Sequence, residues 1–342
     1  MLVVPVVLLV LGVVVASALP VPYVRLSPGP TFNVIGTVDG TPLITIEGTT
    51  TYPTAGHLDM TTVSESGGPV GRLTLGDALR GWVDPVARVV PIEQLYPEDA
   101  TPEQVKEESQ VAFSDSQSDA VAAALRHLDI PVATLTVVSQ VQAGAPADGR
   151  LEAGDVLVSL DGTKVSSPKD VGAAVRAKPV GTTFSFVVRR DGATRTVEVT
   201  SAARPEKGTP YLGILTGITY RGPFTVDFAL DDVGCPSAGT MFALGIVDKL
   251  TPGELNGGRF VAGTGTITAE GEVGPIGGIE QKMVGARRAG AELFLAPESN
   301  CDAVVGNVPE GLVVTPMATL DDAVARVEAF VAGQTLPTCP GS

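Results

Sequence analysis

The chain has 342 residues, 44% of them hydrophobic, and a formal net charge of −15 at pH 7. This length and composition suffice for two or three domains with packed cores, which excludes extensive disorder. The acidic balance disfavours nucleic-acid binding, because phosphate recognition needs clustered Lys and Arg and no run of these residues exceeds two. The sequence has no Cys-x-x-Cys motif or Cys/His cluster, so we expect neither a metal nor a cofactor.

The first 20 residues are predicted to be a transmembrane anchor or a signal segment. Residues 2–19 are apolar apart from Ser17, which is about the minimum length for a helix that crosses a bilayer. We favour a retained single-pass anchor, although Ala16-Ser17-Ala18 is the kind of small-residue motif at which signal peptides are cut. The first basic residue, Arg25, follows the segment, so charge leaves the orientation open.

Residues 21–125 are predicted to form a linker and a small β-containing region. Prolines are frequent between residues 20 and 30, and they favour an extended chain over a helix. Short β-rich runs such as 43–46 follow and are interrupted by Gly and Pro. Strong helix formers at 119–128 close the region, and we place a domain boundary near residue 125.

Residues 126–204 show the pattern of a second, compact domain. Its predicted β-strands are 135–141, 156–160, 184–189 and 194–200, and its single predicted helix is 168–177. The stretch from Ala145 to Gly162 resembles the core of a PDZ domain, which implies binding of extended peptides or C-termini by strand addition. No Gly-Leu-Gly-Phe-type loop lies near 132–138, so recognition of C-termini stays open. The alternative is a module that packs against its neighbour and binds nothing.

Ser237 is a candidate nucleophile because of its position at a predicted helix start. Strands are expected at 213–219 and 224–230, a loop at 231–235 and a helix at 238–250. Free backbone N–H groups at a helix start can stabilise the negative oxygen of a tetrahedral intermediate. The alternative is that Pro236-Ser237 merely caps the helix.

Lys282 is the candidate base for this serine. It lies in a predicted helix that ends at Gly290, after a β-branched strand at 260–268 and a Glu270-Gly271 hairpin turn. A desolvated lysine can accept the proton of a serine hydroxyl near neutral pH. The two histidines, at 57 and 127, lie far upstream, so a Ser-Lys pair is simpler than a Ser-His-Asp triad. The alternative is an ordinary solvated helix lysine.

Four ordered motifs give the C-terminal part a specific resemblance. They are Pro236-Ser-Ala-Gly, Thr264-Gly-x-Ile, the Gly-x-Val-x-Pro-Ile-Gly-Gly run at 271–278, and the lysine four residues beyond Gly278. Residues 210–332 therefore resemble the proteolytic domain of the Lon family (peptidase family S16). The whole chain resembles membrane-tethered PDZ-Lon proteins of Gram-positive, actinobacterial type, with support from Tyr23–Pro30 and Gly56–Val63.

The resemblance implies an α+β multidomain protein whose last domain has the α/β fold of ribosomal protein S5 domain 2. We expect a proteolytic domain at 205–333 with a predicted strand at 293–297 and a helix at 320–332, then a C-terminal tail at 334–342. By the same resemblance the nucleophile is Ser237, the general base Lys282 and the residue that positions the lysine Thr264. The implied oxyanion region is Cys235, Pro236 and Ala238, where Cys235 departs from the usual glycine and narrows the backbone angles available.

The expected function is that of an ATP-independent, membrane-anchored serine endopeptidase acting outside the cytoplasm. The sequence contains no Gly-x-x-x-x-Gly-Lys-Ser/Thr loop, so the expected substrates are unfolded or flexible proteins. The PDZ-like module would select or gate them, and the resemblance implies a homo-oligomeric, six-membered ring. The alternatives are a catalytically idle scaffold in which Cys235 is the lesion, or a redox-sensing role for Cys235.

The three cysteines allow one disulfide. Cys301 and Cys339 are the preferred pair, because a bridge would fix the C-terminal tail in an oxidising compartment. The alternative is three unpaired thiols.

Overall fold

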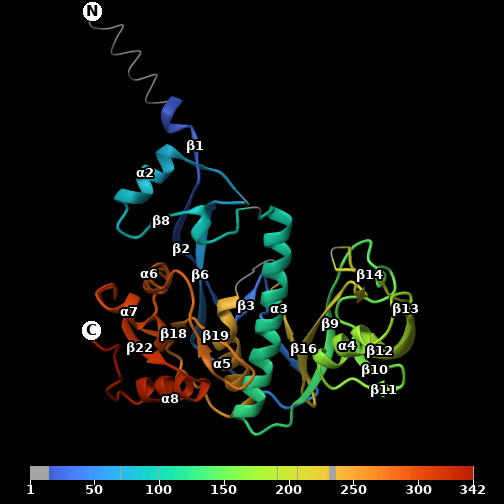
Figure 1. Cartoon of the computed structure of the whole chain (residues 1–342). Coiled ribbons are helices and arrows are strands. Elements are labelled where there is room, and N and C mark those ends of the chain that lie inside the picture. The colour runs from blue at the N-terminus through green and yellow to red at the C-terminus, as the bar shows by residue number, and fades with distance from the viewer. Residues whose placement is uncertain are drawn as a thin grey trace, which may run out of the picture. The chain divides into compact units, whose positions relative to one another are not determined.

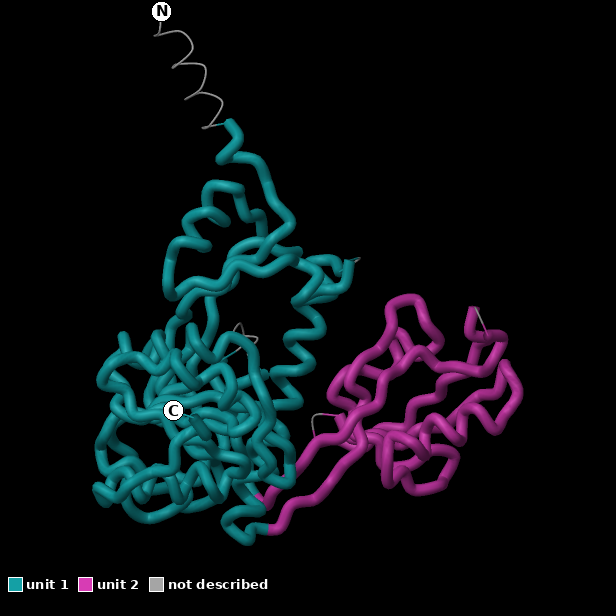
Figure 2. The backbone as a smooth tube through the Cα atoms, turned by 60° about the vertical axis from the view of Figure 1, so that its left-hand side comes forward, with its two compact units in different colours: residues 1–130, 224–342 teal, residues 131–223 magenta. Residues whose placement is uncertain are grey.

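The computed structural model describes residues 15–69, 71–98, 100–190, 192–205, 207–230 and 236–341. The chain forms two compact units (Figure 2): unit 1 contains residues 1–130 and 224–342, and unit 2 contains residues 131–223. Most of the predicted anchor and the 231–235 loop with Cys235 lie outside the described residues. Among the helices of the described ranges, none is both long and apolar enough to cross a membrane.

Unit 1 is built on a six-stranded sheet in the order β22-β21-β18-β6-β2-β8 (Figure 1). These strands are β22 (Val313–Met317), β21 (Leu293–Pro297), β18 (Phe260–Gly263), β6 (His57–Gly67), β2 (Tyr23–Asn33) and β8 (Arg88–Pro91). The first four are mutually parallel, and β2 is antiparallel to both of its neighbours. β6 is therefore a central strand, and its residues 58–62 are buried in succession, as is typical of a strand covered on both faces.

This sheet contains segments that were predicted to belong to two different domains. The region expected as a separate β-containing part at 21–125 contributes β2, β6 and β8 to the same sheet as the predicted strand at 293–297, which is β21. The pairing of β6 with β18 joins residues about 200 positions apart, such as Leu58 with Val261. Local hydrophobic patterns cannot reveal such a partner, because they report only the period of one segment.

Helices cover both faces of the sheet, which makes unit 1 a three-layer structure (Figure 1). Along β21, Leu293 and Leu295 enter one core with α5 (Gly239–Leu250), α3 (Pro102–His127) and α8 (Leu320–Val331). The alternating residues Phe294 and Ala296 enter a second core with α6 (Ile279–Ala289) and α7 (Cys301–Val304). This alternation follows from the two-residue period of a strand.

α3 is much longer than the helix predicted at 119–128. It begins with a capping box in which Thr101 and Gln104 bond each other's backbone N–H groups, and Pro102 occupies the first turn. Its buried residues are concentrated in the second half, where Ala120 and Leu125 enter the core of unit 1. The first half of α3 is polar and shows no helical hydrophobic pattern, so the sequence predicted only the second half, which packs against the core of unit 1.

The preferred disulfide between Cys301 and Cys339 is confirmed. Both residues are buried in the second core, and the bridge ties the C-terminal tail to α7. Thr315 Oγ1 donates a hydrogen bond to the carbonyl oxygen of Pro337, 2.8 Å away, and holds the tail to β22 as well.

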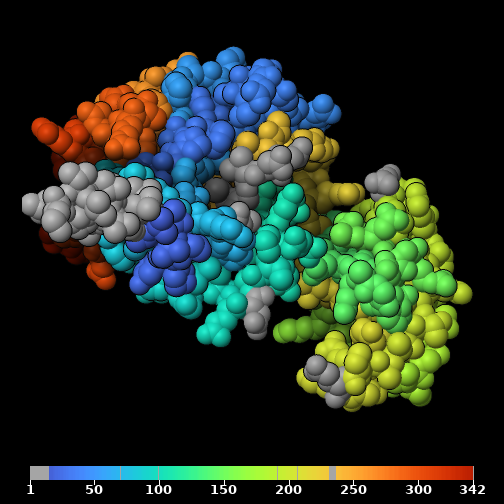
Figure 3. Space-filling view, turned by 90° about the horizontal axis from the view of Figure 1, so that it is seen from above, coloured from blue at the N-terminus to red at the C-terminus, as the bar shows by residue number. Residues whose placement is uncertain are grey.

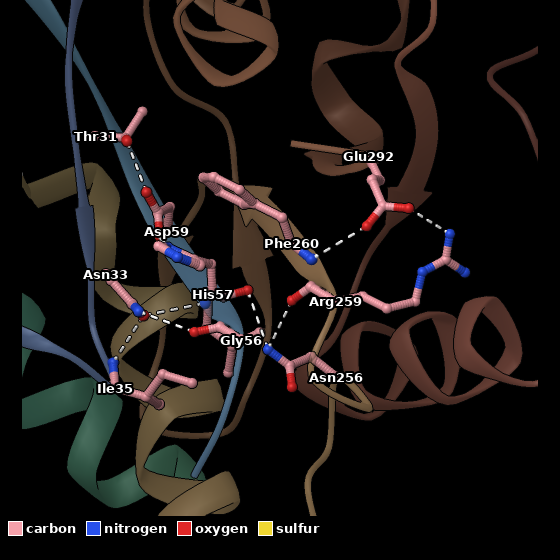
Figure 4. Close-up of polar contacts among 11 residues, drawn as sticks. Thr31, Asn33, Ile35, Gly56, His57, Asp59, Asn256, Arg259, Phe260 and Glu292 are labelled. Atoms are coloured by element: carbon pink, nitrogen blue, oxygen red, sulfur yellow. Dashed lines mark hydrogen bonds and ion pairs between the residues drawn. The ribbon is translucent and has the colours of Figure 1, made fainter. Parts of the chain in front are cut away.

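Hydrogen bonds also connect β6 to its surroundings at its start (Figure 4). Asp59 accepts a hydrogen bond of 2.6 Å from Thr31 Oγ1, and its other carboxylate oxygen lies 3.2 Å from Nδ1 of His57. Burial raises the pKa of Asp59 above its ordinary value, although both hydrogen bonds oppose the shift. Asn256 donates to the carbonyl oxygens of His57 and Arg259 and so joins β6 to the loop before β18.

Short elements complete unit 1. They are β1 (Pro20–Val21) paired with β7 (Leu73–Thr74), α2 (Leu75–Val83), β3 (Thr37–Val38) paired with β4 (Thr41–Pro42), β5 (Ile44–Glu47) paired with β17 (Thr225–Phe228), β19 (Thr266–Ile267) paired with β20 (Val273–Gly274), and the 3-10 turns η1 (Ile92–Gln94), η2 (Pro236–Ala238) and η3 (Glu298–Asn300).

Unit 2 is a sheet in the order β13-β12-β10-β9-β16 with one helix. Its elements are β9 (Ala133–Val141), β10 (Val156–Leu160), β11 (Thr163–Lys164), α4 (Pro168–Arg176), β12 (Thr183–Arg190), β13 (Ala193–Thr200), β14 (Ala202–Ala203), β15 (Pro210–Tyr211) and β16 (Ile214–Arg221). The positive φ angles of Asp161 and Gly162 close the β10–β11 hairpin, as predicted. β16 was predicted as part of the proteolytic domain, but it pairs with β9 of unit 2 along its whole length.

Candidate active site

Ser237 lies in η2, the single 3-10 turn that leads into α5. Ser116 of α3 donates a hydrogen bond of 2.9 Å to the carbonyl oxygen of Pro236 and so holds the residue before the serine. A Cβ at Gly239 would lie 2.8 Å from both Ile267 Cγ2 and Ser116 Oγ, so the turn packs tightly between α3 and β19. Ser116 was not among the predicted site residues, because a serine inside a helix carries no signal of a contact 120 residues away.

Thr264 occupies the gap between β18 and β19, where the strand predicted at 260–268 is interrupted. Its side chain is fully buried, and its Oγ1 donates a hydrogen bond of 3.1 Å to the carbonyl oxygen of Ser237. The backbone N–H of Gly265 donates to the same oxygen at 2.9 Å. The N–H of Thr240 donates in return to the carbonyl oxygen of Gly265 at 3.1 Å. The serine turn and the strand gap therefore hold each other in place.

Lys282 projects from the first turn of α6 toward the same point. The helix starts after Gly278, which has the positive φ of 67° that glycine tolerates best, and it ends at Gly290 as predicted. Lys282 is only 3% exposed, and its Nζ lies 2.7 Å from Oγ of Ser237 and 3.0 Å from Oγ1 of Thr264. The structure thus brings Ser237, Lys282 and Thr264 together, and the alternative of a solvated lysine does not hold.

This arrangement can activate a hydroxyl group. Burial disfavours the charged form of a lysine, and an uncharged amine within hydrogen-bonding distance can accept a hydroxyl proton. Thr264 offers a second hydrogen-bond partner to the amine and limits its orientation. Of the residues expected around the oxyanion, Pro236 and Ala238 flank Ser237 in η2, whereas Cys235 lies outside the described residues.

A groove with a volume of about 980 Å³ opens over Ser237 and Lys282. One wall is a face of α3 whose residues recur at helical spacing, namely Pro102, Glu103, Val105, Lys106, Ser109, Gln110 and Phe113. The lining also includes the loop 275–278 before α6 and the strand residues Leu26 and Val63. Apolar surface predominates in the lining, which is typical of ligand-binding pockets.

The two histidines are engaged elsewhere in unit 1. His57 contacts Asp59 and stacks on Phe260, with 4.4 Å between the ring centroids. Nδ1 of His127 lies 2.5 Å from a carboxylate oxygen of Asp321 in α8. These contacts agree with the prediction that a lysine rather than a histidine accompanies Ser237.

Asp119 is a perturbed carboxyl on α3, three residues after Ser116. Burial and repulsion from Asp115 and Glu270 raise the pKa of Asp119 to about 6 from an ordinary value of 3.8, whereas Arg126 opposes the shift. Above pH 6 the carboxylate is charged in both the folded and the unfolded states, so the folded state carries the cost of burying it. As the pH falls from about 6 to about 4, the folded protein binds the proton first and this cost disappears.

We therefore expect an Asp119→Asn variant to melt at a higher temperature than the wild type at pH 8. The difference should shrink steadily as the pH is lowered through about 6 and vanish near pH 4. Calorimetric melting temperatures across this range provide the measurement. Glu108→Gln, an exposed carboxyl on the same helix, is the matched control and should show no such pH-dependent gain. A gain for Asp119→Asn that stays constant with pH would contradict the assignment.

Comparison with known protein families gives two matches. Residues 111–200 match the PDZ domain family, and residues 232–328 match the C-terminal proteolytic domain of Lon protease (S16). The first match begins within α3, a helix that the structure places in unit 1.

Curated relatives match over about a quarter of this chain. Lon protease of Azospirillum brasilense and Lon protease 1 of Bacillus subtilis (strain 168) are each 39% identical over 90 residues, which is 25% of this chain and 11% of each relative. Lon protease of Mycolicibacterium smegmatis is 37% identical over 93 residues, which is 26% of this chain and 12% of the relative. The alignments thus span about a ninth of the length of these relatives.

Among solved structures, the PDZ domain of an SdrC-like protein from Listeria innocua is 29% identical, with a TM-score of 0.23, and the match covers 24% of this chain and 92% of that one. The corresponding domain from Listeria monocytogenes is 27% identical, with a TM-score of 0.23, and the match covers 24% and 85%. From the family matches, the chain contains a PDZ domain and a proteolytic domain of the Lon (S16) serine-peptidase family.

Proposed function

We propose that the protein is an ATP-independent serine endopeptidase with Ser237 as the nucleophile and Lys282 as the general base. The observation that carries this proposal is the 2.7 Å contact between Ser237 Oγ and the buried Nζ of Lys282 at the base of an open groove. The S16 proteolytic domain match supports the reaction type. The sequence has no ATP-binding phosphate loop, which supports independence from ATP.

In the proposed mechanism, uncharged Lys282 takes the hydroxyl proton of Ser237 while Oγ attacks the scissile carbonyl carbon. The carbonyl oxygen becomes an oxyanion, which backbone N–H groups around Ser237 stabilise. The ammonium of Lys282 then gives its proton to the leaving amine as the C–N bond breaks, leaving an acyl-enzyme. Water, deprotonated by Lys282, attacks the ester, and the proton returns to Ser237. Thr264 keeps the amine oriented throughout.

The substrates are proposed to be unfolded or flexible proteins. The groove is lined by a face of α3 and by strand residues, and we propose that a peptide lies along it in an extended form. A substrate protein offers such a segment where its chain is locally unfolded or mobile.

Covalent labelling by a fluorophosphonate tests the proposal. We expect a stoichiometric adduct on Ser237, identified by peptide mass spectrometry, together with hydrolysis of unfolded casein in the absence of ATP. The Ser237→Ala variant should show neither. A protein that folds but gives no adduct and no hydrolysis would support the second candidate function, a PDZ-containing scaffold with an idle proteolytic domain.

Ser116 is expected to affect catalysis through the serine turn. Replacing Ser116 by Ala removes the hydrogen bond to Pro236 and frees the turn to shift, so we expect kcat to fall by about 10- to 100-fold with little change in KM. The rate of fluorophosphonate labelling should fall in parallel, measured well below the melting temperature. Ser114→Ala, an exposed serine on the same helix, is the matched control. A change in KM alone, or in neither constant, would argue against a positioning role.

Unit 2 is proposed to select or gate substrates through its PDZ domain. β16 stands at the end of the sheet order, and its side chains Leu215 and Ile218 are exposed, which suits addition of a peptide strand. Residues 132–138, where the sequence shows no Gly-Leu-Gly-Phe-type loop, belong mostly to β9, which lies inside the sheet rather than at this end. Peptide-array binding to the full chain, with and without Leu215→Glu, would test this selection.

The proposed location is a membrane, with unit 1 outside the cytoplasm. The apolar run at 2–19 supports the attachment, and the Cys301–Cys339 disulfide supports an oxidising compartment. Flotation of the full chain with vesicles tests the attachment. The six-membered ring implied by the resemblance stays a prediction, to be tested by the mass of the detergent-solubilised protein.

A further inference from the structure

Helix α2 exposes an apolar face. Leu79, Trp82 and Val83 are 50%, 53% and 82% exposed, whereas the small residues Ala78 and Gly81 are buried. An amphipathic helix of a soluble domain normally turns its large apolar side chains toward the core. In α2 the small residues Ala78 and Gly81 pack against the rest of unit 1, whereas Leu79, Trp82 and Val83 are exposed.

The same surface continues onto the chain that precedes β1. Leu19 and Val15 are 54% and 58% exposed. The backbone N–H of Leu75 donates a hydrogen bond of 2.8 Å to the carbonyl oxygen of Leu19, at the start of α2. β1 pairs with β7 immediately after this point, so residues 15–21 and α2 are held as neighbours. Figures 1 and 3 show α2 beside the chain before β1, at one end of unit 1.

We propose that this surface, formed by Val15, Leu19, Leu79, Trp82 and Val83, lies in the interfacial layer of a lipid bilayer. The inference rests on the proposed membrane attachment and extends it to a second, distant part of the chain. The apolar run of the sequence ends at Leu19, and Leu19 is bonded directly to the first residue of α2. A bilayer that holds the run therefore has its surface next to α2.

The residue types of this surface suit that layer. Tryptophan is enriched where hydrocarbon meets headgroups, because its ring is apolar and its N–H can stay hydrated. Trp82 is supported from one side by the edge of Tyr23, with 5.7 Å between the ring centroids. Arg80, next to Leu79 in the sequence, pairs with Asp77 at 3.0 Å and has a side chain that is 78% exposed, and a basic side chain of this kind can reach lipid phosphates. An apolar helix face flanked by a basic residue is typical of helices that lie along a membrane surface.

A protein partner, including a second copy of the chain, is the competing occupant. Continuity decides between them, because Val15 and Leu19 belong to the apolar run itself and the other three residues lie on α2, whose first residue is bonded to Leu19. Scattered exposed apolar residues would need no explanation, but a contiguous patch marks an interaction site.

Trp82 is the only tryptophan of the chain, so its fluorescence reports on this surface without further labelling. The full chain is reconstituted in vesicles of phosphatidylcholine and phosphatidylglycerol, with and without lipids brominated near the carbonyl end of their acyl chains. We expect blue-shifted emission, severalfold stronger quenching by the brominated lipids than by unbrominated ones, and severalfold weaker quenching by aqueous iodide than for free tryptophan. Trp82→Phe should abolish the emission.

A Leu79→Glu/Val83→Glu variant removes the apolar face but leaves the apolar run and Trp82 in place. We expect this variant to float with the vesicles as the wild type does, while its Trp82 becomes accessible to iodide and insensitive to brominated lipids. Wild-type protein that floats but has solvent-exposed Trp82 would overturn the inference. Blue-shifted emission without quenching by brominated lipids would also overturn it and would favour a protein partner.

The outcome is separable from the proposed peptidase function. Casein hydrolysis by the same vesicles reports on Ser237 and Lys282, and neither residue belongs to the α2 surface. A chain that does not float with vesicles would contradict both the membrane attachment and this inference, but it would not contradict the peptidase proposal.

Discussion

A Lys282→Met variant is expected to lose peptide hydrolysis, with kcat/KM lowered by about 1,000-fold or more, because methionine cannot accept the proton of Ser237. Methionine has a similar length and suits a position that is 3% exposed, so the fold should be retained. Hydrolysis of a fluorogenic unfolded substrate and the rate of fluorophosphonate labelling measure the two consequences separately. Both should fall together, since both need an activated serine.

The controls for this variant separate proton transfer from charge. Lys282→Arg keeps a positive charge that cannot be removed near neutral pH, so it should be as inactive as Lys282→Met. Arg288→Met removes an exposed cation from the same helix and should stay fully active. An active Lys282→Met protein would show that another group deprotonates Ser237, and the proposed mechanism would then be abandoned.

Removal of the disulfide is expected to have the largest effect on stability. Cys301 and Cys339 are 38 residues apart, and closing a loop of this length stabilises the folded state by about 4 kcal/mol in the chain-entropy account. We expect the Cys301→Ala/Cys339→Ala variant to unfold at a correspondingly lower urea concentration. The double substitution avoids a new pairing of a freed thiol with Cys235.

Reduction provides the matched control for this prediction. Wild-type protein treated with dithiothreitol should show the same loss as the double variant, whereas the variant itself should not respond to the reductant. The proposed proteolytic site lies on α6, η2 and the gap after β18, so the folded double variant should retain peptide hydrolysis at low temperature. Equal stability of the variant and the oxidised wild type would contradict the expected contribution of the bridge.

Local chemistry made several features predictable from the sequence. Glycine supplied the positive φ angles of the Asp161-Gly162 and Glu270-Gly271 turns and the end of α6 at Gly290, because these conformations depend on one or two residues. The strand at 293–297 and the helix at 320–332 showed clear hydrophobic runs or periodicity, and they correspond to β21 and α8. The candidate site residues followed from motifs in which the order and spacing of residues are informative.

Only the tertiary structure decided which segments pair and which faces are covered. The sequence predicted β16 as a strand but assigned it to the proteolytic domain, whereas its hydrogen bonds go to β9 of unit 2. It could not reveal that Ser116 holds the carbonyl of Pro236, or that α2 turns its apolar residues outward. Periodicity describes one segment at a time, but the partner of a strand edge or a helix face is selected by hydrogen bonding and burial across the whole chain. The sequence by itself therefore determined the local elements and the chemically distinctive residues, and the packing of distant segments decided how they are brought together.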